Sequence, residues 1–245
     1  MRLTVTLLAL LFSLASFAQT ADELKASGQQ RYDQEDYAGA QSAFDRAIAL
    51  KKDDAELYIL RGNARLQLKD GKGAIEDYSA AIAVKPSARA YHNRGIVKKN
   101  AKDYDGAIAD YTKAIATDPS YKYAYQSRAL LLTVEKEDNK AALADLQKYI
   151  QLDPGDAECY SLSGVVRGRL GDNKNAIADF TRALELDSKN TDVYYYRGVL
   201  EMREQQQTAA CADFAQAIKA GFEITDKAVI DFIKKCPKGR TYIVN

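Results

Sequence analysis

Residues 88–121 read ARAYHNRGIVKKNAKDYDGAIADYTKAIATDPSY, and this stretch decides the fold. Each half places apolar residues three and four positions apart, which predicts two amphipathic helices. A short polar stretch around Lys102 and Asp103 joins the halves and is typical of a turn. Pro119 stands just past the second half, where a helix cannot continue. The stretch therefore predicts a helix–turn–helix unit.

The same pattern recurs along the chain at intervals of 33 to 35 residues. The first helix has a motif that begins with a tyrosine. Arg or Ser follows three residues later, and Gly or Ala follows four residues later. The tyrosines are Tyr58, Tyr91, Tyr125, Tyr160 and Tyr194. An Ala-x-x-Asp motif followed by a large apolar residue marks the second helix: Ala74, Ala107, Ala142, Ala176 and Ala210. A weaker copy comes earlier, with Gly28 and Phe44. Repetition at this period predicts a stacked array of supersecondary units. Six repeats are expected, at residues 21–54, 55–87, 88–121, 122–156, 157–190 and 191–224.

Two positions of each repeat carry small residues. The eighth is Gly or Ala in every repeat, and the twentieth is Ala, as at Gly62 and Ala74. We expect the two helices to approach closely there, and a bulky side chain at either place would cost roughly 1–3 kcal/mol through overpacking.

This pattern resembles the tetratricopeptide repeat across essentially the whole chain after the leader. The resemblance implies an all-α, right-handed superhelical solenoid of six helix-turn-helix units in a single domain, residues 19–245. The fourth repeat departs from it, with Leu146 for the aromatic residue and one extra residue near 137–139, where a bulged turn is expected. A further helix at residues 225–236 is expected to cap the exposed end of the array.

Arginine recurs at the seventh position of the repeat and aspartate at the twenty-third. One interpretation is a functional ladder of charges. We favour structural pairing within or between repeats, because charges near a helix interface are rarely left unpaired. In the first repeat both are missing, with Ser27 and Ala43 in their places. In the fifth, Ser163 stands opposite an intact Asp179, which weakens the pairing interpretation.

Residues 1–18 read as a secretory signal peptide. Arg2 precedes an apolar run from Leu3 to Ala15, and Ser16 and Ala18 supply the small residues of a cleavage site before Gln19. We therefore expect an exported protein, periplasmic or secreted; the alternative is a retained N-terminal anchor. No later segment has the apolar length of a membrane-spanning helix.

The charge of the chain gives no indication of a nucleic-acid partner. It carries 35 Lys and Arg against 34 Asp and Glu, and losing Arg2 with the leader makes it formally neutral. Nucleic-acid binders usually present a basic face, and the basic clusters here are typical of solvated helix ends.

We predict no enzyme, cofactor or metal site. The only histidine is His92, and a nucleophilic site needs a nucleophile, a base and an orienting group. Its single imidazole and the three scattered cysteines do not have the spacing of a structural zinc site. The chain is therefore predicted to bind other molecules rather than to catalyse a reaction.

In tetratricopeptide proteins the first helices line a concave groove, mainly with their second, fifth, ninth and twelfth positions. The resemblance carries this role to the fifth- and ninth-position residues of each repeat. The fifth-position residues are Lys25, Ile59, His92, Gln126, Ser161 and Tyr195. The ninth-position residues are Gln29, Asn63, Ile96, Leu130, Val165 and Val199. The ninth series changes from polar to aliphatic at the third repeat, which suits an extended peptide or an amphipathic helix. Alternatively, curvature buries these aliphatic side chains.

The leading hypothesis is a non-catalytic scaffold that binds a protein or peptide partner in this groove. The alternatives are a structural subunit that self-associates or docks through its outer face and, more weakly, an enzyme with an unrecognised site.

A disulfide between Cys211 and Cys236 is predicted in an oxidising compartment. Cys211 occupies the twenty-first position, which should face the capping helix, and Cys236 stands at the end of that helix. Counted back from the turn near Gly221, the two differ by about three helical residues, or roughly 4.5 Å of rise. The alternative is a pair of buried thiols in contact. Cys159 is expected to remain free.

Overall fold

The computed structural model describes residues 19–237, and all thirteen elements in that range are α-helices. They are α2 (Ala21–Asp33), α3 (Tyr37–Leu50), α4 (Ala55–Gln67), α5 (Gly71–Val84), α6 (Ala88–Asn100), α7 (Tyr104–Thr117), α8 (Lys122–Val134), α9 (Asn139–Leu152), α10 (Ala157–Arg169), α11 (Asn173–Leu186), α12 (Thr191–Arg203), α13 (Gln207–Lys219) and α14 (Lys227–Ile233). The expected signal peptide, residues 1–18, lies outside the described residues. None of these helices is both long and apolar enough to cross a membrane.

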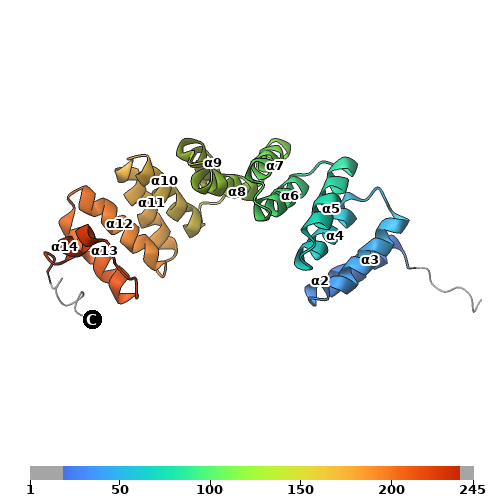
Figure 1. The fold of residues 1–245 in the computed structure, drawn as a ribbon, viewed down its shortest axis with the longest axis horizontal. Helices are drawn as coiled ribbons and strands as arrows, with labels where there is room; N and C mark the ends of the chain where they lie inside the picture. Colours follow the sequence, from blue (N-terminus) through green and yellow to red (C-terminus); the bar gives the residue numbers. More distant parts are fainter. Residues whose placement is uncertain (1–18, 238–245) are drawn as a thin grey trace, which may run out of the picture. The chain divides into compact units, whose positions relative to one another are not determined.

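Consecutive helices form antiparallel pairs, such as α4 with α5 and α10 with α11 (Figure 1). The second helix of one pair packs against the first helix of the next, as α3 does on α4 and α11 on α12. The chain divides into an N-terminal unit, residues 1–110, and a C-terminal unit, residues 111–245, with the boundary inside α7. The expected all-α fold of repeated helix pairs is confirmed.

Short polar signals set the helix ends. The second helix of several pairs begins at an aspartate whose carboxylate accepts a backbone N–H of the first turn, as Asp70 does from Gly73 at 2.9 Å. The turn before it contains a residue in the left-handed conformation: Glu35, Lys69, Lys102, Glu137, Gly171 and Gln205. This conformation closes the turn, so the two helices pack face to face.

In several pairs the core contains an aromatic ring pressed on a glycine, whereas the fourth repeat has Leu146 and Ala129 at these positions. A Cβ atom added to Gly164 would lie 2.7 Å from the Phe180 ring, and one added to Gly62 would lie 2.8 Å from the Tyr78 ring. Both rings are buried. The small eighth position is thus required by packing, because no side chain fits between the helix and the ring.

The recurring arginine and aspartate pair across the two helices of a repeat. Arg128 donates from Nε and Nη2 to both carboxylate oxygens of the buried Asp145, each at 2.7 Å. Arg94 does the same to Asp110 at 2.9 and 2.7 Å. Burial opposes ionisation of Asp110, but hydrogen bonds from Arg94 and Lys98 outweigh it and hold its pKa below the ordinary value. The structural interpretation of these charges is confirmed.

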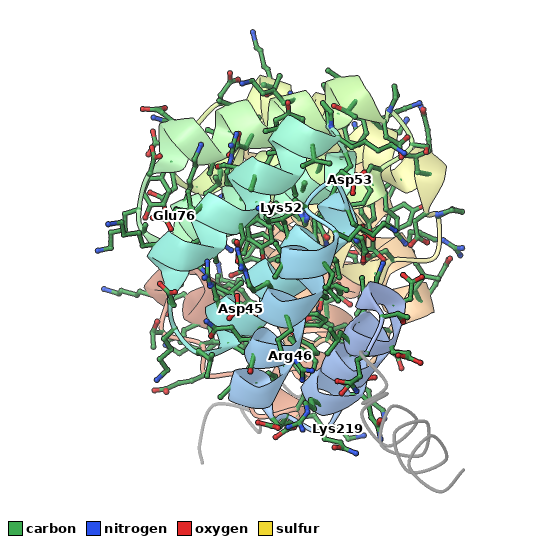
Figure 2. All side chains as sticks on the ribbon, turned by 90° about the vertical axis from the view of Figure 1, so that its right-hand side faces the viewer. Asp45, Arg46, Lys52, Asp53, Glu76 and Lys219 are labelled. Carbon is green, nitrogen blue, oxygen red and sulfur yellow. A yellow bond between two sulfur atoms is a disulfide. The ribbon has the colours of Figure 1, made fainter. Side chains whose placement is uncertain are left out.

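Each of these arginines also reaches back to the preceding helix pair through Nη1. Arg128 donates to Thr112 at 2.9 Å, Arg197 to Thr181 at 3.0 Å and Arg94 to Ser79 at 2.9 Å. Arg61 makes the same contact with Asp45 at 2.6 Å. Asp45 and Glu76 are both exposed (Figure 2). Asp77, next to Glu76 in the sequence, is buried. One side chain therefore joins three helices.

The fifth repeat corrects one expectation. Asp179 does not lack a cation, because Arg167, four residues after Ser163, donates from Nε to its carboxylate at 2.8 Å. Ser163 itself donates its hydroxyl to Asp179 at 2.6 Å. Positions four residues apart lie on the same face of a helix, so an arginine at either one reaches the same aspartate.

The fourth repeat has the wider turn that its extra residue predicts. In other pairs an N–H of the turn bonds the carbonyl five residues before it, as from Asp70 to Arg65. Here Asp138 bonds Leu132, six residues before it.

The capping helix is shorter than the expected range of 225–236. Its first turn is capped by Asp226, which accepts from Ala228 and Val229, and it ends at Ile233. The next residues form a tighter turn in which the N–H of Cys236 bonds the carbonyl of Ile233. Cys236 and Cys211 are joined by a disulfide with their Cα atoms 5.7 Å apart, and Cys159 is a free, buried thiol. Val229 and Ile233 pack on Phe214 of α13.

Candidate functional site

The first helices of the last three pairs, α8, α10 and α12, carry six of the twelve predicted groove residues. All six line one of two adjoining hollows in the C-terminal unit: Gln126, Leu130, Ser161, Val165, Tyr195 and Val199. Val165 lines both hollows, so they share a wall. We call this surface the first-helix face of the C-terminal unit.

The first hollow, named here the Leu130 hollow, lies between α8 and α10 and has a volume of about 490 Å³. Leu130 is 42% exposed, so curvature does not bury this aliphatic side chain. The residues around it are mainly amides, hydroxyls and aliphatic groups, with Glu158 as the one charged side chain in its lining. The free thiol of Cys159 is also in the lining, and burial raises its pKa to about 12.

The second hollow, named here the Gly168 hollow, lies between α10 and α12 and has a volume of about 330 Å³. Its apolar lining includes Phe180, Tyr196, Val199 and Leu200. Tyr196 stacks on Phe180 at a centroid distance of 6.3 Å and is 44% exposed. Arg169, Arg203 and Asp226 line it as well and supply its charge. Together the two hollows give a mostly apolar surface with polar ends.

The predicted groove residues of the N-terminal unit are less uniformly placed. Ile59 and His92 are buried, at 3% and 8% exposure. Nζ of Lys25 lies 4.0 Å from Oδ2 of Asp54. Nε2 of Gln29 donates a hydrogen bond to Oδ1 of Asp33 at 2.9 Å. Asn63 and Ile96 line a small hollow of about 250 Å³.

In that small hollow the polar groups already satisfy one another. The hydroxyl of Tyr78 donates to Oδ1 of Asn63 at 2.8 Å, and Nδ2 of Asn93 donates to the same oxygen at 3.1 Å. A larger hollow of about 550 Å³ in the same unit contains the Arg89–Glu56 ion pair. Charged side chains form most of the lining of this larger hollow, unlike the linings of the two hollows in the C-terminal unit.

Several lining residues were not predicted from the sequence. Gly168, Arg169, Tyr196, Arg203 and Asp226 lie outside the fifth and ninth positions of their repeats. One signal was present in the aligned repeats, because Gly168 is the only glycine at the twelfth position.

A buried carboxyl group lies on α12, behind this face. Glu201 occupies the eleventh position, where the second, third and fifth repeats have Arg65, Lys98 and Arg167. It is 6% exposed, and its Oε2 has no hydrogen-bond partner within residues 19–237. Burial, and then the nearby charge of Asp213, raise the pKa of Glu201 to about 7, although Arg197 opposes this.

Replacing Glu201 with glutamine is expected to stabilise the protein at pH 8 and to change little at pH 4. The pKa of Glu201 is about 7 when folded against 4.5 in the reference state, so its destabilisation is absent below pH 4.5, grows between these values and is complete above pH 7. This difference between the two pKa values corresponds to at most about 3 kcal/mol in the free energy of unfolding. Urea unfolding at both pH values measures it.

The control for this experiment is Glu185→Gln, because the Glu185 side chain is 57% exposed. It should shift stability by less than about 0.5 kcal/mol at either pH. An equal gain for Glu201→Gln at pH 4 and pH 8 would show that the charge of Glu201 is not the cause.

The described residues contain no group of three or more His, Cys, Asp or Glu side chains placed to hold a metal ion.

Models of one family match most of the chain. Two models described as tetratricopeptide repeat match it, one at residues 88–121 and the other at residues 26–90 and 163–222. A comparison with curated proteins gave no match.

Solved structures of several repeat proteins are similar. YrrB, described as a tetratricopeptide protein with an unusual peptide-binding site, has a TM-score of 0.68 and 26% identity over 79% of this chain and 98% of its own. The C-terminal part of a repeat protein from Cytophaga hutchinsonii has a TM-score of 0.67 and 17% identity, and the match covers 88% of this chain and 84% of its own. MamA from Desulfovibrio magneticus has a TM-score of 0.61 and 20% identity, and the match covers 68% of this chain and 94% of its own. The last two show similarity of fold alone.

Proposed function

The chain belongs to the tetratricopeptide repeat family, and from this premise we propose that it is a non-catalytic scaffold that binds a peptide segment of a partner protein on the first-helix face of its C-terminal unit. Proteins of this family bind protein or peptide partners. The observation that carries the proposal is the pair of adjoining hollows that share Val165 and are lined by six predicted groove residues.

The physical reason is the cost of leaving apolar side chains in water. Leu130 and Tyr196 are more than two-fifths exposed, and the aliphatic Val165 and Val199 lie between them on the same face. When a partner covers such groups, the free energy falls by about 25 cal/mol for each Å² of apolar surface buried. Contiguous apolar surface of this kind marks interaction sites in soluble proteins. The likeness to YrrB, which has a peptide-binding site, supports the same proposal.

A non-catalytic role is supported by the state of the reactive side chains. The one histidine, His92, is buried, and Cys159 is buried with a raised pKa, which disfavours the reactive thiolate. We propose that the protein acts outside the cytoplasm, in the periplasm or as a secreted protein, because residues 1–18 have the pattern of a signal peptide.

Replacing Leu130 and Val165 together with aspartate is expected to reduce capture of the partner by at least tenfold. Each change puts an unpaired charge where the partner would bury an apolar contact. The measurement is affinity capture from an envelope extract, with the partner identified and quantified by mass spectrometry. Helicity by circular dichroism should not change.

The matched control is Leu170→Asp, since Leu170 is 39% exposed on α10's C-terminal end but lines neither hollow. It should retain full capture. If the double variant loses helicity, the single Leu130→Asp variant decides, because Leu130 is exposed. Unchanged capture by a folded variant excludes this face as the binding site. Light scattering of the protein alone tests the alternative of self-association, for which a clean monomer is the contrary result.

A further inference from the structure

The twelfth position of the repeat carries a side chain in every pair but one. In the other five it is Tyr32, Leu66, Lys99, Thr133 or Met202. In the fifth repeat it is Gly168, on α10. Gly168 lies in the last turn of α10, one residue before the helix ends at Arg169.

Packing explains the other glycine of this helix face but not Gly168. A Cβ atom at Gly164 would lie 2.7 Å from the Phe180 ring, so no side chain fits there. A Cβ atom at Gly168 would lie 3.5 Å from Leu200, which is an ordinary van der Waals contact. The backbone therefore has room for a Cβ atom at position 168. Its absence leaves the Gly168 hollow open between α10 and α12.

The lining of this hollow indicates what enters it. At about 330 Å³ it stands near the lower limit of ligand sites, which run from roughly 300 to 1,000 Å³, so it suits one side chain rather than a whole peptide. Tyr195 stacks on Phe222 at 4.6 Å and meets Tyr196 edge to face at 5.6 Å. Aromatic walls of this kind favour an aromatic guest in offset or edge-to-face contact.

The charges around the hollow favour an acidic neighbour of that side chain. Arg169 and Arg203 are both exposed, and within residues 19–237 Arg169 donates from Nη1 to the carbonyl of Thr133 at 3.1 Å. Asp226 is the one carboxylate in the lining, and its Oδ1 already accepts from the backbone of α14. The lining therefore carries two guanidinium groups and one carboxylate, and Arg is the cation best suited to bind carboxylates.

We propose that the Gly168 hollow is an anchor pocket for one aromatic side chain in an acidic segment of the partner protein. The proposal rests on the function proposed above and adds the chemical class of the segment. The aromatic ring lies over Gly168 between Tyr196 and Leu200, and flanking carboxylates meet Arg169 and Arg203.

The test uses three end-blocked, fluorescently labelled peptides, GDDFDDG, GDDADDG and GKKFKKG, and the protein from Gln19 onward. Fluorescence anisotropy should show GDDFDDG binding at least tenfold more tightly than either of the others. Gly168→Met fills the hollow with the residue that the sixth repeat carries at this position, and it should lower affinity for GDDFDDG at least tenfold. The midpoint of urea unfolding should stay equal or rise, because methionine is the better helix former. Loss of binding without loss of stability cannot come from damage to the fold.

Three results would overturn the proposal: equal binding of GDDFDDG and GDDADDG, equal binding of GDDFDDG and GKKFKKG, or full affinity in Gly168→Met. Should methionine perturb the helix, Gly168→Ala gives the same comparison with a single added carbon. Capture of the natural partner separates the two proposals. Capture lost in Leu130→Asp but kept in Gly168→Met overturns the anchor pocket alone, and capture kept in both overturns the proposed function as well.

Discussion

Replacing Asp145 with alanine is expected to destabilise the C-terminal unit by about 3–5 kcal/mol. Asp145 is 5% exposed and accepts two hydrogen bonds from Arg128, whose side chain is 22% exposed. The change leaves a guanidinium group between two helices with Thr112 as its remaining acceptor in this clamp. Urea unfolding followed by circular dichroism measures the loss.

The matched control is an ion pair of the same unit that lies in water. The side chains of Arg182 and Glu185 are 46% and 57% exposed, so Glu185→Ala should cost less than about 1 kcal/mol. Equal effects of the two substitutions would contradict the structural role of the buried pair. Asp145→Asn, which keeps the shape but not the charge, should fall between them.

Removing the disulfide with Cys211→Ser and Cys236→Ser is expected to lower the stability of the C-terminal end by about 3.5 kcal/mol on the chain-entropy model. The bond closes a loop with a sequence separation of 25 and fastens the short α14 over Phe214. Urea unfolding followed by circular dichroism measures this loss, and a reductant should lower the midpoint of the native protein but not that of the double variant.

Mass spectrometry of the natively purified protein, digested without reductant, tests whether the bond forms in the cell. The expected spectrum contains a peptide that joins Cys211 to Cys236, with Cys159 free and Gln19 at the N-terminus. Alkylation of all three thiols after unfolding, or a bridge that contains Cys159, would show that the bond is not native.

The helix pairs could be predicted from the sequence because every repeat has the same residue types at the positions where its two helices pack. The small eighth position was expected to meet the small twentieth position, and in the structure the large side chain at the twenty-fourth also lies against it, as Phe180 does on Gly164. The arginine–aspartate pairing was predictable for the same reason. Asp179 was misread because its cation comes from Arg167. The seventh and eleventh positions are four residues apart in the sequence but only one helical turn apart in space, so an arginine at either position can reach the same aspartate.

The hollows could be predicted only in part. The fifth and ninth positions point to the first-helix face, but the depth of a side chain there depends on its neighbours. Ile59 is 3% exposed while Leu130 is 42% exposed, although both positions were assigned to the groove. The Gly168 hollow comes from a missing side chain, and Arg203 and Asp226 reach it from outside the repeat positions considered. The extent of the capping helix also depended on local capping, by Asp226, rather than on the repeat.

The arginine that joins three helices has a consequence for the order in which the repeats can stand. Every repeat with arginine at the seventh position follows one with Asp, Ser or Thr at the twenty-fifth: Arg61 after Asp45, Arg94 after Ser79, Arg128 after Thr112 and Arg197 after Thr181. The fourth repeat has Gln147 at that position, and the repeat after it has Ser163 instead of arginine. The last repeat has Ala215 there and is followed by α14. Asp, Ser and Thr all serve as acceptors, so an arginine repeat can follow the first, second, third or fifth repeat. Deleting the fifth repeat would instead place Arg197 after Gln147 of the fourth repeat and remove its acceptor Thr181, so the fifth repeat is needed at this junction.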